Sequence, residues 1–254
     1  MRVLPLERNI IYGPLFSRRL GRSLGVNLLP TGCKLCSFDC VYCHYGRTDV
    51  KTLAPKRGDF PAVRRVLTVV EMALRKYPNV AYLTFSGNGE PTLHPHFPTI
   101  TAAVRRLRDE LSPEVRLAIF SNGTTAHLPR IREALALFDA PILKLDAGDT
   151  ETLARINRPA PEVKLEDILD GLKKVPGCII QSVLVDGKVS NIQGEAFEAW
   201  VAALAAVRPT QVQIYSTDYP VPEAGVEQVL PYVLKRIAGE VEERTGLQVR
   251  AYWL

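Results

Sequence analysis

Short apolar runs alternate along the chain with longer segments in which apolar residues recur every three or four positions. The short runs have the length of buried β-strands, and the longer segments have the spacing of amphipathic helices. Strands are predicted at residues 23–29, 80–85, 115–120, 141–146, 178–185 and 211–216. Helices are predicted at residues 60–77, 98–110, 128–137, 165–175, 195–207 and 229–245, and a short strand or tail at 248–253. Strands that alternate with helices in this way form a parallel α/β sheet.

The residues able to carry chemistry gather where the predicted strands end. Ligands of parallel α/β sheets and barrels bind at this edge. Six strand–helix units are fewer than the eight of a closed barrel, for which about 250 residues are typical. The sequence therefore predicts an α/β domain whose binding site follows the carboxyl ends of its strands.

A cysteine-rich loop follows the first predicted strand and holds four of the five cysteines, at Cys33, Cys36, Cys40 and Cys43. A disulfide role fits badly, because a chain of 254 residues buries a core without covalent links and the sequence shows no secretory signal. Structural zinc sites use cysteine pairs separated by roughly 12–20 residues, far more than the gap between the pairs here. Iron–sulfur clusters are held by cysteines with gaps of about two or three residues in one loop. The pattern favours an iron–sulfur cluster, with a zinc site and a redox thiol pair as alternatives.

The spacing Cys36-x3-Cys40-x2-Cys43, with Tyr42 directly before the last cysteine, resembles the signature of the radical S-adenosylmethionine (SAM) superfamily. The resemblance implies that three thiolates hold a [4Fe-4S] cluster, whose fourth iron binds SAM. An electron from the cluster then cleaves SAM to a 5'-deoxyadenosyl radical, which abstracts hydrogen from a substrate. Tyr42 is implied to flank the adenine. Cys33 lies outside the signature, and we expect it to be a bystander or a protective thiol rather than a fourth ligand.

The superfamily resemblance also implies a fold and a domain division. Its partial barrel of six parallel strands, (β/α)6, fits the number of predicted units, with the cluster loop after the first strand. We expect a basic N-terminal extension at residues 1–22, followed by a radical SAM partial-barrel domain at residues 23–254.

Two turns after predicted strands resemble further elements of the superfamily. Residues 86–91 read Ser-Gly-Asn-Gly-Glu-Pro, similar to the Gly-Gly-Glu-Pro element that holds the methionyl ammonium, with Asn88 in place of a glycine. Residues 121–124 read Ser-Asn-Gly-Thr and resemble a turn that reaches the ribose or the methionine moiety; an ordinary strand-to-helix turn is the alternative. Lys144 and Asp146 alternate along one strand and face the same side, either into the barrel or as a surface pair. The expected cofactor contacts are Tyr42, Ser86, Gly87, Asn88, Gly89, Glu90, Ser121, Asn122, Lys144, Asp146, Gln181 and Tyr215.

The substrate is less closely defined. Four segments together resemble a prokaryotic subgroup related to the wyosine-type tRNA-modifying synthases: Tyr12-Gly13-Pro14, Ser17-Arg18-Arg19-Leu20-Gly21, the turn at residues 86–91, and Gln213-Ile214-Tyr215. The chain lacks the second cysteine cluster of the wyosine enzymes, which weakens the transfer of their reaction to this chain. A tRNA base is the first candidate substrate, and a reductant such as flavodoxin or ferredoxin is implied. The alternatives are a glycyl-radical-type activating enzyme acting on a partner protein, and a non-enzymatic electron-transfer or RNA-binding protein that uses all four clustered cysteines.

The charge balance and the apolar runs set limits on partners and location. The chain has 32 basic and 27 acidic residues, a net charge of +5, which permits an anionic partner such as RNA without requiring one. Three cations at Arg18, Arg19 and Arg22 form either a solvated loop or a contact to phosphate or carboxylate. The helix predicted at residues 98–110 has a basic face with Arg105, Arg106 and Arg108, for which we predict solvent exposure. No apolar run reaches the roughly 20 residues that span a bilayer, so we expect no membrane partner. The missing signal peptide and the unpaired cysteines predict a cytoplasmic protein, and an iron–sulfur cluster implies an oxygen-sensitive enzyme.

Overall fold

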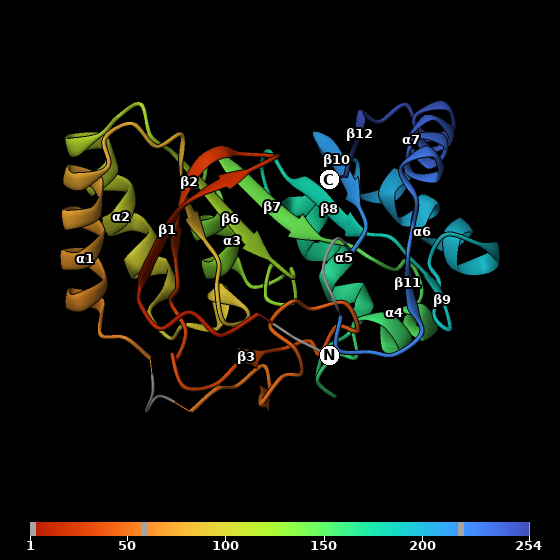
Figure 1. Cartoon of the computed structure of the whole chain (residues 1–254), viewed down its shortest axis with the longest axis horizontal. Helices are drawn as coiled ribbons and strands as arrows, with labels where there is room; N and C mark the ends of the chain where they lie inside the picture. Colours follow the sequence, from red (N-terminus) through yellow and green to blue (C-terminus); the bar gives the residue numbers. More distant parts are fainter. Residues whose placement is uncertain (1–3, 57–59, 218–220, 254) are drawn as a thin grey trace.

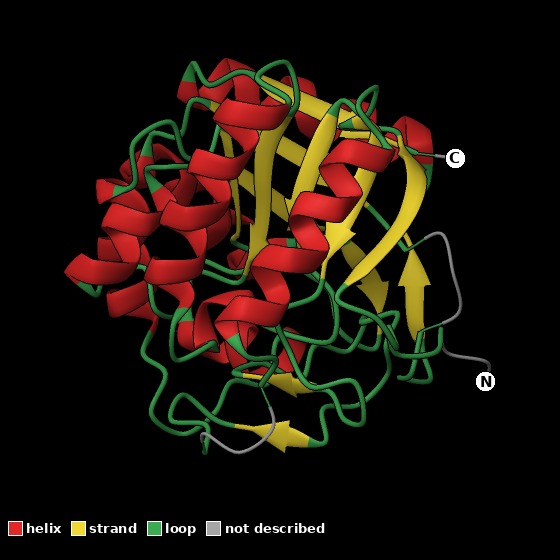
Figure 2. Ribbon diagram, turned by 90° about the vertical axis from the view of Figure 1, so that its left-hand side faces the viewer, coloured by secondary structure: helices red, strands yellow, loops and turns green. Residues whose placement is uncertain are grey.

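The computed structural model describes residues 4–56, 60–217 and 221–253, so the first three residues of the expected N-terminal extension lie outside the described residues. Eight strands form one sheet in the order β1-β2-β5-β6-β7-β8-β10-β12 (Figure 1). The strands are β1 (Ile11–Ser17), β2 (Gly21–Val26), β5 (Tyr82–Phe85), β6 (Arg116–Ser121), β7 (Ala140–Lys144), β8 (Ile179–Val183), β10 (Gln211–Tyr215) and β12 (Val249–Tyr252). Neighbours from β2 to β12 pair in parallel, and the sheet curls into a half-barrel (Figure 2). The predicted partial barrel of parallel strands is confirmed.

The structure adds two strands at the edges of the six predicted ones. Strand β12 continues the parallel sheet beyond β10, where the sequence predicts a short strand or tail. Strand β1 pairs antiparallel with β2 at the other edge, and the sequence did not predict it. Its residues do not alternate between apolar and polar because most of the strand is at least partly exposed. The hairpin turn that follows β1 becomes important for the site.

The helices cover the outer face of the sheet, as Figure 2 shows. They are α1 (Val63–Lys76), α2 (Phe97–Leu111), α3 (Pro129–Leu135), α4 (Thr150–Ile156), α5 (Leu165–Lys174), α6 (Gly194–Val207) and α7 (Pro231–Thr245). Their apolar faces supply the main core; α1, for example, buries Val66, Val70 and Leu74. Each such side chain contributes about 1.5–3 kcal/mol on burial. Among the described residues no helix is long and apolar enough to cross a membrane.

The concave face of the half-barrel has its own small apolar cluster. Leu20, from the turn between β1 and β2, packs there against Ala118 and Ile142. Phe120 and Ile179 border the same cluster. The hairpin turn is thereby inserted into the concave side, and it closes the barrel at the amino ends of the parallel strands.

An ion pair between a buried arginine and a partly buried carboxylate lies at the amino ends of β6 and β7. Arg108 is only 4% exposed, so the prediction of a solvated position is wrong for this arginine. Its Nη1 donates to Asp139 Oδ2 at 2.8 Å and to the Val115 carbonyl at 2.6 Å. Helical spacing alone did not reveal the carboxylate that α2 faces, because Asp139 comes from a different segment.

Candidate functional site

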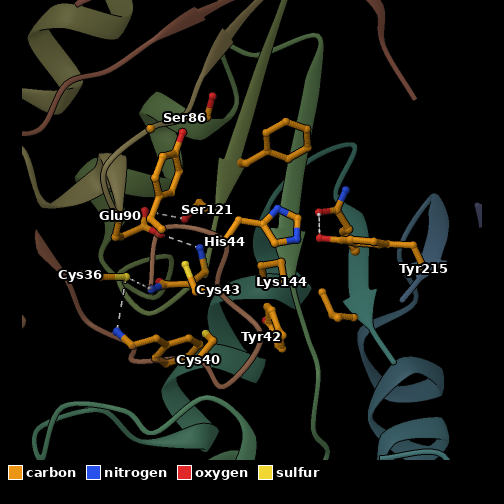
Figure 3. A pocket seen from close by; sticks show the side chains of 18 of the residues that line it. Cys36, Cys40, Tyr42, Cys43, His44, Ser86, Glu90, Ser121, Lys144 and Tyr215 are labelled. Carbon is orange, nitrogen blue, oxygen red and sulfur yellow. Dashed lines mark hydrogen bonds between the residues drawn. The ribbon is translucent and has the colours of Figure 1, made fainter. Parts of the chain in front are cut away.

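A pocket of about 310 Å³ opens at the carboxyl ends of the parallel strands, next to the cysteine loop. This loop includes the short strand β3 (Leu35–Cys36), which pairs with β4 (Val50–Lys51), and Figure 1 shows it below the sheet. The pocket brings together most of the residues predicted from the sequence: Cys36, Cys40, Tyr42, Cys43, Ser86, Gly87, Gly89, Glu90, Ser121, Asn122, Lys144, Gln181 and Tyr215. Figure 3 shows the three cysteines on one side of the pocket and Tyr215 on the other.

The turn after β5 joins the sheet to the cysteine loop. Leu35 N–H donates to the Asn88 carbonyl at 3.0 Å, and Glu90 N–H donates to the Leu35 carbonyl at 3.2 Å. Gly89 has a φ of +140°, and a Cβ there would overlap the Leu35 carbonyl. Only glycine allows the two backbones to approach this closely. The turn thus fixes the loop at the residue beside Cys36.

Asn88 lies outside the pocket lining, although the sequence places it among the expected contacts. It is fully buried, and its Nδ2 donates to the Glu7 and Pro30 carbonyls, each at 2.9 Å. Its Oδ1 accepts from Glu7 N–H at 2.8 Å. Asn88 therefore ties the turn to the N-terminal segment, and its backbone does not take the positive φ of the flanking glycines.

Glu90 connects the turns after β5 and β6. Its Oε1 accepts hydrogen bonds from Thr92 N–H at 3.0 Å, Thr92 Oγ1 at 2.7 Å and Ser121 Oγ at 2.8 Å. Its Oε2 accepts from Asn122 N–H at 2.6 Å. Burial raises the pKa of Glu90, and these donors oppose that effect. A carboxylate has about four acceptor sites, so Oε2 has capacity for a cation in the pocket.

Asp146 also lies behind the pocket wall rather than in its lining. Its Oδ2 accepts from the Tyr42 hydroxyl and, at 2.7 Å, from Asn157 Nδ2. Its Oδ1 accepts from Val183 N–H at 2.7 Å and lies 3.2 Å from Lys144 Nζ. Lys144 and Asp146 form an ion pair, although β7 ends at Lys144 and Asp146 follows it. Asp146 holds the cysteine loop, through Tyr42, against the ends of β7 and β8.

The thiols of the cysteine loop receive N–H donors from three directions. Phe38 N–H and Asn122 Nδ2 lie 3.5 and 3.6 Å from Cys36 Sγ. Asn157 Nδ2, at the end of α4, lies 3.4 Å from Cys40 Sγ. Burial raises the pKa of Cys36, and that of Cys40 to about 12, so both thiols need a positive partner to ionise.

A buried lysine supplies positive charge beneath these thiols. Lys34 is 2% exposed, and its Nζ donates to the Gly46 carbonyl at 2.5 Å. Burial alone would lower the pKa of Lys34, but nearby charge on Cys43, Cys36 and Cys40 outweighs it and raises the pKa. Lys34 therefore places a buried positive charge in the cysteine loop.

Comparison with protein families identifies the chain. The model of the Radical SAM superfamily matches residues 33–189, which include the cysteine loop and the turns after β5 and β6. The chain belongs to the radical SAM superfamily. Members of this superfamily are enzymes that use a [4Fe-4S] cluster and SAM and require a reductant.

Two relatives of this radical SAM chain are UPF0026 proteins. It is 38% identical over 165 residues to UPF0026 protein MJ1312 of Methanocaldococcus jannaschii, covering 64% of this chain and 48% of that protein. It is 32% identical over 214 residues to UPF0026 protein slr1464 of Synechocystis sp., covering 84% of this chain and 77% of that protein. The chain thus spans about half the length of UPF0026 protein MJ1312.

Solved structures share the fold at low sequence identity. A structure of TYW1 with a lysine-pyruvate adduct bound superposes with a TM-score of 0.62 and 16% identity, over 88% of this chain and 74% of that chain. The structure of Streptococcus suis SuiB bound to S-adenosylmethionine superposes with a TM-score of 0.60 and 14% identity, over 89% of this chain and 50% of that chain. These likenesses concern the fold.

The residues present fit a cluster of the radical SAM type. Cys36, Cys40 and Cys43 line one pocket, whereas Cys33 is described by the structure but does not line it. Soft thiol ligands, N–H donors to sulfur and a buried ammonium all suit an anionic iron–sulfur cluster. Within the described ranges, no group of three or more His, Cys, Asp or Glu side chains could hold one metal ion. A multi-iron cluster binds its cysteines at separate corners, so its ligands need not meet at one point.

Sequence reasoning missed several residues that line the radical SAM pocket or support it. Asn157 is not part of the lining but contacts Cys40 and Asp146. Tyr12 lines the pocket, and its OH lies 2.5 Å from Ser86 Oγ. Arg19 comes from the hairpin turn and Phe120 from inside β6, whereas Phe38, His44 and Tyr45 belong to the cysteine loop. Two features of the sequence could have indicated some of these residues. Phe120 directly precedes the predicted contact Ser121, and Tyr12 and Arg19 lie in segments that resemble the tRNA-modifying subgroup. Asn157 had no signal beyond its place after a short helix.

Proposed function

We propose that this radical SAM enzyme cleaves SAM reductively in the pocket beside the cysteine loop and transfers the radical character to a bound substrate. The observation that carries the proposal is that Cys36, Cys40 and Cys43 line the same pocket as the turns after β5 and β6. When bound, the cluster and SAM supply one reducing electron, methionine and a 5'-deoxyadenosyl radical. A reductant of the flavodoxin or ferredoxin type replaces that electron.

The side chains take different parts in binding. Cys36, Cys40 and Cys43 hold the cluster, and Glu90 Oε2 faces the methionyl ammonium. Tyr42 is a further cofactor contact. The others lie on the turns after β5 and β6 and on the wall of the pocket opposite the cysteines: Ser86, Gly87, Gly89, Ser121, Asn122, Lys144, Gln181 and Tyr215. Asn88 and Asp146 act indirectly, since they hold the Glu90 turn and Tyr42 in place.

A tRNA base is the first candidate substrate. The net charge of +5 supports it, as does the resemblance of the hairpin and β10 segments to the tRNA-modifying subgroup. If the candidate is correct, affinity for bulk tRNA falls steeply as salt rises, because phosphate contacts release counterions. Filter binding from low to moderate salt measures this. Absence of binding at low salt would direct the search to a partner protein, as for a glycyl-radical-type activating enzyme.

The reaction itself is tested by anaerobic reconstitution with iron and sulfide. Dithionite and SAM are then added, and 5'-deoxyadenosine is measured by chromatography. We expect product from the wild type and from Cys33→Ala, and none from Cys36→Ala, Cys40→Ala or Cys43→Ala. A four-iron cluster that forms in the wild type without any 5'-deoxyadenosine would favour electron transfer instead.

A further inference from the structure

Arg19 reaches the pocket from the hairpin turn between β1 and β2. The adjacent Leu20 is buried on the concave face of the sheet, which fixes the turn inside the half-barrel. Arg19 lines the pocket, and its Cζ lies 4.4 Å from the centre of the Tyr215 ring and 5.8 Å from that of Phe120. Figure 3 places Tyr215 on the side of the pocket opposite the cysteines.

The guanidinium of Arg19 has no counter-charge in the part of the chain that the structure describes. Its Nε and Nη1 atoms are buried and have no hydrogen-bond partner there. A buried donor without an acceptor destabilises the protein, and a charged donor does so more strongly. Contact with the faces of aromatic rings stabilises a cation only weakly, so it does not replace an anion.

The other charged groups around the pocket are already matched. Lys144 Nζ lies 5.3 Å from the centre of the same Tyr215 ring but is 3.2 Å from Asp146 Oδ1. Glu90 is the acidic residue among the described lining residues, and it accepts four hydrogen bonds from the turns after β5 and β6. No carboxylate of the described lining is therefore left for Arg19.

We infer that Arg19 binds an anionic oxygen group of the substrate, a carboxylate or a phosphate. The inference rests on the proposed function, in which the cluster and the methionyl group of SAM lie next to the cysteines and Tyr215 also contacts SAM. A substrate with such a group at its end would place it on Arg19, between Tyr215 and Phe120. The rest of the substrate would then extend towards SAM. The pocket selects anionic substrates through this one contact.

Binding of small probes tests the subsite in the reconstituted protein with SAM present. Inorganic phosphate and acetate are titrated separately by anaerobic calorimetry. We expect one of them to bind, with affinity reduced at least about tenfold in Arg19→Gln and partly restored in Arg19→Lys. The exposed neighbour serves as the matched control, so Arg18→Gln should bind like the wild type. Binding of phosphate alone assigns a phosphorylated substrate, and binding of acetate alone assigns a carboxylate.

Three results would overturn the subsite. The first is that neither probe binds the wild type, and the second is that the better probe binds Arg19→Gln equally well; either would mean that Arg19 does not hold the anion. The third is that Arg19→Gln weakens SAM binding instead of probe binding, which would make Arg19 a cofactor contact. Failure of the proposed function is recognised separately, because the wild type would then make no 5'-deoxyadenosine whatever the probes do.

Stability supplies a second measurement that does not depend on the probe. An unmatched buried charge destabilises the free protein, so we expect Arg19→Met to melt at the same or a higher temperature than the wild type without added anion. An arginine with a purely structural role would give the opposite result, a clearly lower melting temperature.

Discussion

On the cysteine side of the pocket, Glu90 accepts four hydrogen bonds, and the buried Lys34 donates to the Gly46 carbonyl. On the opposite side, two nitrogens of Arg19 are buried with no hydrogen-bond partner among the described residues. The first arrangement builds a rigid frame before any ligand arrives, which favours the precise placement of a cluster and SAM. The second leaves free energy to be gained when an anion binds. In the proposed function, the first side positions the cluster and the methionyl group of SAM, and Arg19 on the other side selects the substrate.

The largest expected effect comes from removing the close approach between the frame and the cysteine loop. In Gly89→Ala the new Cβ would overlap the Leu35 carbonyl, so the turn and the loop must separate. We expect a loss of more than about 3 kcal/mol in the free energy of unfolding, together with poor iron incorporation. Urea unfolding and iron analysis measure the two effects. Gly32→Ala is the matched control, because nothing lies within 4 Å of a Cβ there; equal behaviour of both variants would show that the turn does not fix the loop.

Next in size is the loss of the Glu90 carboxylate. Glu90→Ala leaves donors from Thr92, Ser121 and Asn122 buried without their acceptor, and we expect a cost of about 2–3 kcal/mol. Glu90→Gln keeps one oxygen acceptor and should cost about 1 kcal/mol. Urea unfolding of the iron-free protein compares them. If both variants were as stable as the wild type, the hydrogen-bonded frame would not explain the rigidity of this side.

A smaller effect concerns the electronic properties of the cluster. Lys34→Met removes a buried positive charge near three cysteines, so the reduced cluster, which is more negative, loses stabilisation. We expect the midpoint potential of the cluster to become more negative by the order of tens of millivolts. A redox titration monitored by electron paramagnetic resonance measures this shift. Lys51→Met is the control, since Lys51 pairs with Cys36 in the β3–β4 ladder but is exposed. An unchanged potential in Lys34→Met would mean that the ammonium does not act on the cluster.

The smallest effect lies at the other end of the strands and depends on pH. Burial would raise the pKa of Asp139, but Leu117 N–H at 2.7 Å and Arg108 outweigh it, so the pKa is lowered. A lowered pKa in the folded state contributes stability above the unfolded value of about 3.9, and this contribution is lost as the pH falls through the folded value. We expect the stability difference between wild type and Asp139→Asn to shrink below about pH 4, as measured by urea unfolding of the iron-free protein. A difference that stays constant from neutral to acidic pH would show that ionisation of Asp139 contributes nothing.

The sequence predicted those parts of the molecule that depend on local order along the chain. The six central strands, the helices between them and the convergence of Cys36, Cys40 and Cys43 follow from apolar periodicity and from spacing within one loop. Strand β1 was missed because an exposed edge strand has little apolar alternation.

The missed contacts depend on segments that are distant in sequence. Asn157 meets Cys40 across 117 positions, and Arg108 meets Asp139 across 31. Arg19 was one of three cations in a turn, and only the fold shows that its neighbour Leu20 enters the barrel. Asn88 and Asp146 were placed among the contacts because strand alternation and motif position do not say whether a side chain faces the pocket or the layer behind it.

The central claim is that the three-cysteine loop leaves an iron open to SAM beside the Glu90 turn. The most direct measurement is the electron paramagnetic resonance spectrum of the reduced, reconstituted protein with and without SAM. The account predicts a four-iron cluster in the wild type and in Cys33→Ala, with a spectrum that changes when SAM is added. A four-iron spectrum that is identical with and without SAM, and that is lost in Cys33→Ala, would contradict the account and make Cys33 the fourth ligand.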